Sequence, residues 1–201
     1  MASSTEICNL AISHLGSTKR IANLDTEQST EAALFRTLYD TTIDIVLRDY
    51  RWPFATKIGA LALIEEDPND EWRYSYSYPT DAVEIRRILS GIRNDARDSR
   101  VPYKIAYSSS GRILFCDIDD AEVEYTIRIT DPQLYPPDFI MALSFRLASY
   151  AAPALTAGDP FKMGDRAMKM YQYEISKATA TSFNEEQPDQ LPDSEFVRAR
   201  E

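Results

Sequence analysis

The middle of the chain reads Trp-Arg-Tyr-Ser-Tyr-Ser-Tyr-Pro at residues 72–79. Four large aromatic side chains alternate there with Arg or Ser, and this period of two predicts a β-strand with one apolar face. Pro79 ends the strand, because proline cannot donate a backbone hydrogen bond to a neighbouring strand. Residues 123–129 repeat the alternation. The central part of the chain is therefore predicted to be β-structure.

Other short segments in this part of the chain carry the same signal. A turn is expected at Asp67-Pro68-Asn69-Asp70, and Ser109-Ser110-Gly111 predicts a hairpin. Five or six strands at hairpin spacing predict an antiparallel sheet or a small sandwich. The further segments expected to be strands are 60–64, 83–89, 103–108 and 112–117.

Helical spacing replaces this pattern toward the N-terminus. Ser3 and Glu6 have the spacing of a capping box, and Gly16 suits the residue that follows a helix, so a short helix is expected between them. A second helix is expected to begin near Thr30. It should end before Trp52-Pro53, because a residue that precedes proline avoids the helical conformation.

Helical spacing returns after Pro136-Pro137. Residues 138–155 are apolar almost all round, which predicts a central, buried helix. Asp159 followed by Pro160 predicts the start of a last helix. The apolar positions expected on that helix recur every three or four residues: Phe161, Gly164, Met168, Tyr171, Ile175 and Ala178.

The expected fold class is α+β. Residues 1–57 and 132–181, which hold the N- and C-terminal helices, are predicted to form one helical bundle. Residues 58–131 are predicted to form an inserted antiparallel β-sheet or small sandwich. Residues 182–201 are predicted to form an extended C-terminal arm.

The arm is expected because residues 182–201 are polar, acidic and proline-containing, and such a segment cannot bury a core of its own. It still carries one large apolar anchor, Phe196. Arg198 and Arg200 could donate charge-assisted hydrogen bonds to carboxylates of a partner. We therefore expect an arm that orders on another protein, and a solvated terminus is the alternative.

The chain has 201 residues and a formal net charge of −10. Such a surface repels phosphate, so tight wrapping of nucleic acid is disfavoured, whereas DNA could slide past it. The most apolar stretch, 139–155, contains Arg146 and Pro153 and is expected to be a buried helix, so no membrane insertion is expected. Cys8 and Cys116 are expected to be free thiols, because nothing in the sequence indicates an oxidising compartment.

No set of residues has the spacing of a catalytic or cofactor site. His14 is the single histidine and has no visible triad partners. No Cys/His cluster has zinc spacing, and no glycine run is suited to phosphate. We therefore expect a protein that is not an enzyme and needs no cofactor. Asp117, Asp119 and Asp120 are expected to be turn acids, and a metal-dependent hydrolase built on them is the alternative.

Two aromatic groups are candidates for contact with other chains. Trp52 and Phe54 follow a helix end, where they either wedge helices against the sheet, the favoured interpretation, or serve an interface. The second group either lines a sandwich core or meets a neighbouring subunit whose polar groups would satisfy the Tyr hydroxyls. Its members are Trp72, Tyr74, Tyr76 and Tyr78.

A set of segments, taken in order and spacing, resembles a known family. The set looks like the tail tubular protein A or head-to-tail adaptor family of tailed bacteriophages, and it runs over nearly the whole chain. Its segments are Ile7-Cys8-Asn9-Leu10-Ala11 with Leu15-Gly16, Thr30-Glu31-Ala32-Ala33, Val46-Leu47-Arg48-Asp49-Tyr50-Arg51-Trp52-Pro53-Phe54-Ala55, residues 72–79, and Arg198-Ala199-Arg200.

The resemblance implies a structural virion subunit, made in the host cytoplasm, that forms a ring, typically of twelve subunits. The ring would lie between the portal protein above and a tail tube or nozzle protein below. It would prolong the channel through which double-stranded DNA passes without sequence-specific binding. The family implies no catalytic residue. A monomeric peptide-binding module, with residues 72–78 exposed as a groove, is the alternative from the residues alone.

Overall fold

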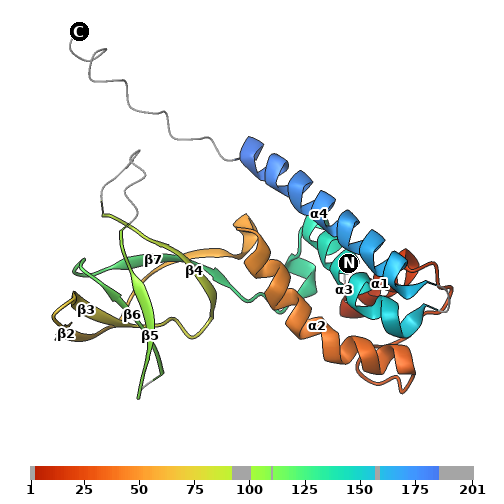
Figure 1. Ribbon diagram of the computed structural model, residues 1–201, viewed down its shortest axis with the longest axis horizontal. Coiled ribbons are helices and arrows are strands. Elements are labelled where there is room, and N and C mark those ends of the chain that lie inside the picture. The colour runs from red at the N-terminus through yellow and green to blue at the C-terminus, as the bar shows by residue number, and fades with distance from the viewer. Residues whose placement is uncertain (1–2, 92–100, 110, 157–158, 186–201) are drawn as a thin grey trace, which may run out of the picture. The chain divides into compact units, whose positions relative to one another are not determined.

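The structure is a computed structural model, and it describes residues 3–91, 101–109, 111–156 and 159–185. The described residues contain four α-helices and two antiparallel sheets, which confirms the α+β class (Figure 1). The chain divides into two compact units. The helical unit comprises Met1–Ala55 and Arg128–Asn184, and the β unit contains Thr56–Ile127.

The helical unit begins with α1 (Ser4–His14) and α2 (Thr30–Asp49). The predicted capping box is present, since the Glu6 amide donates to Ser3 Oγ and the Ser3 amide donates to Glu6 Oε2. Gly16 follows α1 with φ +73°, a left-handed conformation that glycine adopts at low cost. A short 3₁₀ turn, η1 (Pro53–Ala55), ends this half of the unit.

The second half of the helical unit contains η2 (Pro132–Leu134), α3 (Pro137–Leu155) and α4 (Pro160–Glu185). The α3 helix is the predicted central helix, and both α1 and α2 pack against it. Asp159 caps α4 as predicted, because its Oδ1 accepts from the Lys162 amide at 3.1 Å. The helix α4 includes residues 182–185, which were expected in the arm, and the rest of the arm lies outside the described residues.

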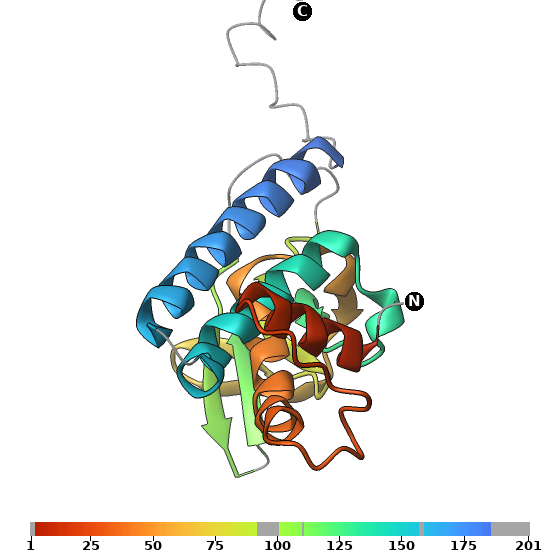
Figure 2. The same cartoon turned by 90° about the vertical axis from the view of Figure 1, so that its right-hand side faces the viewer.

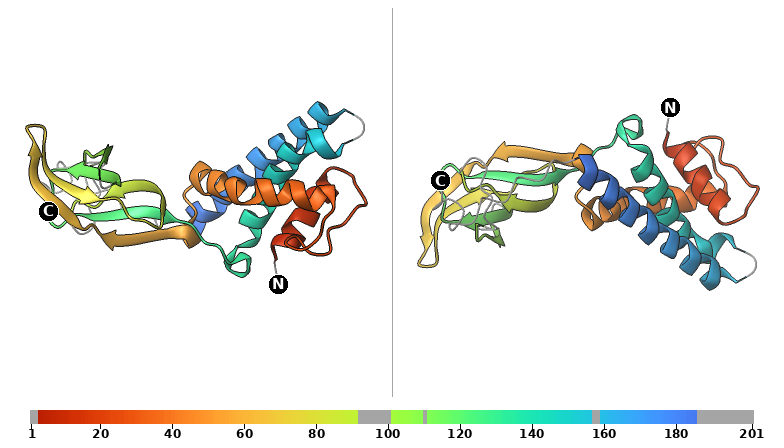
Figure 3. Two further views of the ribbon diagram at one scale, coloured as in Figure 1. Left: turned by 90° about the horizontal axis from the view of Figure 1, so that it is seen from below. Right: turned by 90° about the horizontal axis from the view of Figure 1, so that it is seen from above.

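Figures 2 and 3 show α4, in blue, beside α3, in teal. Gly164 allows the two backbones to approach closely. A Cβ atom at this position would lie 3.4 Å from the Ser149 carbonyl oxygen and 3.6 Å from the Ala152 Cβ. A longer side chain at position 164 would therefore push the two helices apart.

The β unit has seven strands in its described part: β1 (Thr56–Ala60), β2 (Leu63–Asn69), β3 (Trp72–Ser77), β4 (Ala82–Ile88), β5 (Lys104–Ser108), β6 (Gly111–Cys116) and β7 (Glu122–Ile127). They form one sheet in the order β1-β7-β4 and another in the order β2-β3-β6-β5 (Figure 1). Both sheets are antiparallel, and the buried cluster of the unit draws on both. Its buried members are Leu61, Tyr76, Tyr78, Ile85, Ile88, Leu114, Cys116, Ala121, Val123 and Tyr125.

The single strand expected at 60–64 is wrong, because the chain changes sheets inside it. The Leu61 amide donates to the Ala121 carbonyl at 2.9 Å, and the Ala62 carbonyl accepts from the Ser77 amide at 2.8 Å. The strand β2 then runs to Asn69, through most of the turn expected at 67–70. Pro68 is tolerated there because β2 lies at the edge of its sheet, where one side of the backbone needs no partner.

Candidate functional site

Trp52 lies in the core of the helical unit, with 1% of its surface exposed. Its indole Nε1 donates to the Val46 carbonyl oxygen at 2.8 Å. Its ring meets those of Tyr50 and Phe139 edge to face, each at a centroid distance of 5.0 Å. A side chain buried this completely offers no surface to a partner, so the structure places Trp52 among the core residues.

Phe54 belongs to the same aromatic cluster but is only half-buried. Its ring lies 5.0 Å from that of Phe139 and 6.1 Å from those of Trp52 and Tyr135. The cluster therefore joins the end of α2 to the start of α3 within the helical unit. Part of Phe54 stays accessible, whereas most of its contacts are internal.

The predicted aromatic row on β3 divides between core and surface. Tyr76 and Tyr78 are 1% and 7% exposed, whereas Trp72 and Tyr74 are half-buried. The Tyr76 hydroxyl donates to the Ile118 carbonyl oxygen at 2.8 Å. The Ile118 carbonyl of the same chain thus satisfies the Tyr76 hydroxyl, for which a neighbouring subunit was considered as the source of a polar partner. The inner half of the row, Tyr76 and Tyr78, is therefore core.

The remaining candidates from the arm, Phe196, Arg198 and Arg200, lie outside the described residues.

His14 connects α1 to α3. Its Nε2 lies 3.0 Å from Ser144 Oγ, and its ring stacks on Phe145 at 3.8 Å with an interplanar angle of 16°. Ser144 Oγ donates to the Met141 carbonyl at 2.8 Å, so it is free to accept from a protonated Nε2. Burial lowers the pKa of His14 from its ordinary 6.5. These contacts make His14 a packing residue.

Both cysteines are free thiols and both are buried. Burial raises the pKa of the Cys8 thiol to about 12 and also raises that of Cys116. A thiolate is the reactive form of cysteine, and burial disfavours it at both positions. Each thiol fills apolar space within its own unit.

The acids proposed for the metal hypothesis lie at the turn between β6 and β7. Asp117 Oδ1 accepts from the Arg73 amide at 3.0 Å, and Asp119 Oδ1 accepts from the Asp120 amide at 2.9 Å. Asp120 has φ +47°, as expected of a turn residue. Across the part of the chain that the structure describes, no three His, Cys, Asp or Glu side chains are placed to hold a metal ion.

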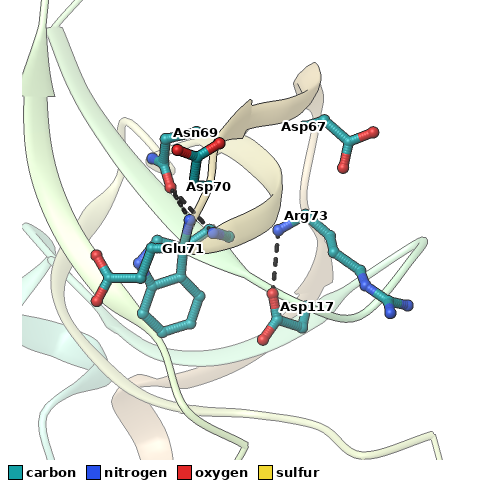
Figure 4. Close-up of a pocket in the computed structure, with 7 residues that line it drawn as sticks. Asp67, Asn69, Asp70, Glu71, Arg73 and Asp117 are labelled. Carbon is teal, nitrogen blue, oxygen red and sulfur yellow. Dashed lines mark hydrogen bonds between the residues drawn. The ribbon is translucent and has the colours of Figure 1, made fainter.

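Asp117 also borders an open hollow of about 570 Å³ at the β2–β3 turn. Four carboxylates and a single cation, Arg73, line it. Figure 4 shows the Arg73 guanidinium extending away from the Asp117 carboxylate. The negative charge of Asp119, followed by burial and the charge of Glu66, raises the pKa of Tyr74 on the neighbouring part of β3. The hollow is therefore an acidic surface that the carboxylate spacing alone did not reveal.

The sequence patterns also missed a set of exposed apolar side chains. Phe161, expected on the buried face of α4, is 79% exposed. Isolated exposed apolar residues are ordinary, but these gather on a few elements. In the β unit they are Ile58, Leu63, Ile64, Ile105 and Tyr107, and in the helical unit they are Leu134, Tyr150, Phe161, Met170 and Tyr173.

The five exposed apolar residues named for the β unit lie on β1, β2 and β5, and each of these strands forms an edge of its sheet. An edge strand offers unpaired backbone groups beside its side chains, which is a common basis for pairing with another chain. The edge β5 carries Ile105 and Tyr107, which are 41% and 80% exposed.

No protein-family model matches the chain, and no curated protein matches it. No helix among the described residues is long and apolar enough to cross a membrane.

Proposed function

We propose that the chain is a structural head-to-tail adaptor of a tailed bacteriophage. Copies of it form a closed ring of twelve in the neck of the virion, between the portal protein and the tail tube or nozzle protein. The ring prolongs the channel through which double-stranded DNA leaves the capsid. The chain performs no catalysis in this role.

The observation that carries the proposal is the presence of exposed apolar side chains on both units. In the β unit they lie on three of the four edge strands, β1, β2 and β5, and in the helical unit they lie on α3, α4 and η2. A ring needs two different surfaces on each subunit, because every contact joins one face of a copy to another face of the next. A chain with one such face would stop at a dimer. The resemblance of segments 7–16, 30–33 and 46–55 to the adaptor family gives this assembly its place in the phage.

The charge of the chain supports passage of DNA through such a ring. A net charge of −10 repels phosphate at long range and disfavours tight binding. A channel subunit must let DNA move, so weak interaction suits the role better than a basic lining would.

The test is to mix the purified chain with portal rings of its own phage and to image the mixture by negative stain. A second ring stacked coaxially on the portal is the expected result. Portal rings that remain bare at all protein concentrations would contradict the proposal. Capsids without portal provide the control, and the chain should not attach to them.

A further inference from the structure

The exposed side of α4 carries a row of cations. Lys162, Arg166, Lys169 and Lys177, named here the basic stripe, are all exposed. At about 100° per residue they fall within roughly 80° of one another around the helix, and they span about 22 Å along it. The residues of α4 that face the core, Ala167, Tyr171, Glu174 and Ala178, lie roughly 130° away.

The basic stripe carries four positive charges, and one exposed carboxylate of the same helix, Asp165, lies about one turn from Lys162 and from Lys169. Lys177 lies 3.9 Å from Glu174, and no ion pair of Lys162, Arg166 or Lys169 is found among the described side chains. Tyr173 lies in the middle of the stripe and is 61% exposed. Tyr and Arg are the residue types that most often dominate binding at protein interfaces. A face of this kind fits an acidic partner.

The same chain carries an acidic surface of matching character. The acidic tip is defined here as Glu66, Asp67, Asp70, Glu71, Asp117 and Asp119, all exposed. Four of them, Asp67, Asp70, Glu71 and Asp117, line the hollow shown in Figure 4, where Arg73 is the only lining cation. Glu71 has one exposed partner, Lys104, at 3.3 Å.

We infer that the basic stripe of one copy docks on the acidic tip of a second copy of this chain. The two surfaces are oppositely charged, and they lie on different elements, α4 and the β2–β3 and β6–β7 turns. Such a contact is head-to-tail, so it leaves one stripe and one tip free for further copies. The inference rests on the proposed function in one respect, since it names the contact by which the ring closes.

Duplex DNA is the other ligand that a row of cations could take. A second copy is favoured because the net charge of −10 opposes approach to a polyanion, whereas the acidic tip supplies a complementary surface on every copy. Tyr173 has a place in this contact as well, because the hollow of about 570 Å³ beside Trp72 has room for an aromatic side chain.

The first experiment measures self-association of the full chain by sedimentation velocity over a wide concentration range. At about 50 mM salt, association should increase with concentration, and at about 500 mM it should weaken because the Debye length falls below half its value. A monomer at every concentration in low salt would overturn the inference. The inference would also be overturned if association were equally strong at both salt concentrations, or if the salt effect did not depend on protein concentration.

Two charge-reversed variants locate the contact. One carries Lys162→Glu, Arg166→Glu and Lys169→Glu, and the other carries Glu66→Lys, Asp70→Lys and Glu71→Lys. Each alone should associate at least about 100-fold more weakly than the wild type, since three attractions become repulsions. Their equimolar mixture should recover association, because each variant then meets the opposite charge. The mixture removes net charge as an explanation.

The matched control exchanges charge for equal charge at the stripe: Lys162→Arg, Arg166→Lys and Lys169→Arg. This variant should associate within about threefold of the wild type. Variants that associate normally after charge reversal, or a mixture that fails to recover, would place the contact elsewhere. If the stripe variant no longer bound labelled duplex DNA but self-associated as the wild type does, the stripe would be a DNA-binding surface and the inference would be overturned. Portal attachment is scored separately, so copies that associate through stripe and tip without binding portal would refute the proposed function alone.

Discussion

Replacing Trp52 by Ala tests whether the aromatic cluster at the end of α2 holds the helical unit together. Trp52 is 1% exposed, and a buried Trp loses roughly 150 Å² of apolar contact on truncation. At about 25 cal/mol per Å² this amounts to about 4 kcal/mol. Loss of the Nε1 hydrogen bond to the Val46 carbonyl adds to this value, and partial collapse of the cavity reduces it. We expect the free energy of unfolding to fall by about 3–5 kcal/mol.

The assay is urea unfolding followed by the helical circular dichroism signal. With a slope of about 2 kcal/mol per M, the midpoint of the helical unit should fall by about 2 M. Fluorescence of the remaining Trp72, which lies in the β unit, shows whether that unit stays folded. Trp52→Phe keeps one ring and loses the Nε1 hydrogen bond to the Val46 carbonyl, so it should cost about 1–3 kcal/mol and remain measurable if the Ala variant does not fold.

Phe161→Ala is the matched control, since this aromatic ring is 79% exposed and its loss should change the unfolding free energy by less than about 0.5 kcal/mol. A folded Trp52→Ala variant with an unchanged midpoint would refute the core assignment. If that variant also failed to self-associate, Trp52 would belong to an interface.

Three further predictions concern other parts of the chain. Since burial lowers the pKa of His14, the unfolded chain binds a proton that the folded chain does not between pH 6.5 and the lower folded value. The unfolding free energy should therefore decrease as the pH is lowered through that window. The decrease should be smaller in His14→Gln, as measured by urea unfolding at each pH. Gly164→Ala should stabilise the protein by up to about 1 kcal/mol, because helix propensity improves and the new Cβ, 3.4 Å from the Ser149 carbonyl oxygen, makes a van der Waals contact. Gly164→Leu, in contrast, should lower the melting temperature, because its longer side chain has no room against α3. Removing residues 186–201 should leave the unfolding midpoint unchanged and should reduce attachment to portal-bearing capsids; normal attachment would show that this segment is a solvated terminus.

Local signals in the sequence predicted most elements of the fold. The capping box at Ser3 and Glu6, the left-handed Gly16 and the alternation at residues 72–78 all depend on neighbours in the chain, so they can be read without tertiary structure. The change of sheet between Leu61 and Ala62 cannot be predicted from neighbouring residues alone. It is fixed by pairing with Ala121 on one side and Ser77 on the other, both distant in sequence.

Burial along α4 shows the same limit. The expected stripe included Phe161, but the buried line runs through Ala167, Tyr171, Glu174 and Ala178. Apolar spacing favoured Phe161, but burial depends on where α3 meets α4, and that contact includes Gly164. The opposite charges of α4 and the β2–β3 turn could not be predicted from the sequence either, because a count of charged residues does not show on which face of an element each charge lies.

The most direct test of the proposed function is a reconstruction of the neck of the virion without imposed symmetry. Twelve copies of this chain should form a closed ring between the portal and the tail protein, coaxial with the DNA channel, with α4 of each copy against the β2–β3 turn of the next. The proposal is contradicted if the chain is absent from the neck, or present there as unassociated or two- or three-fold copies.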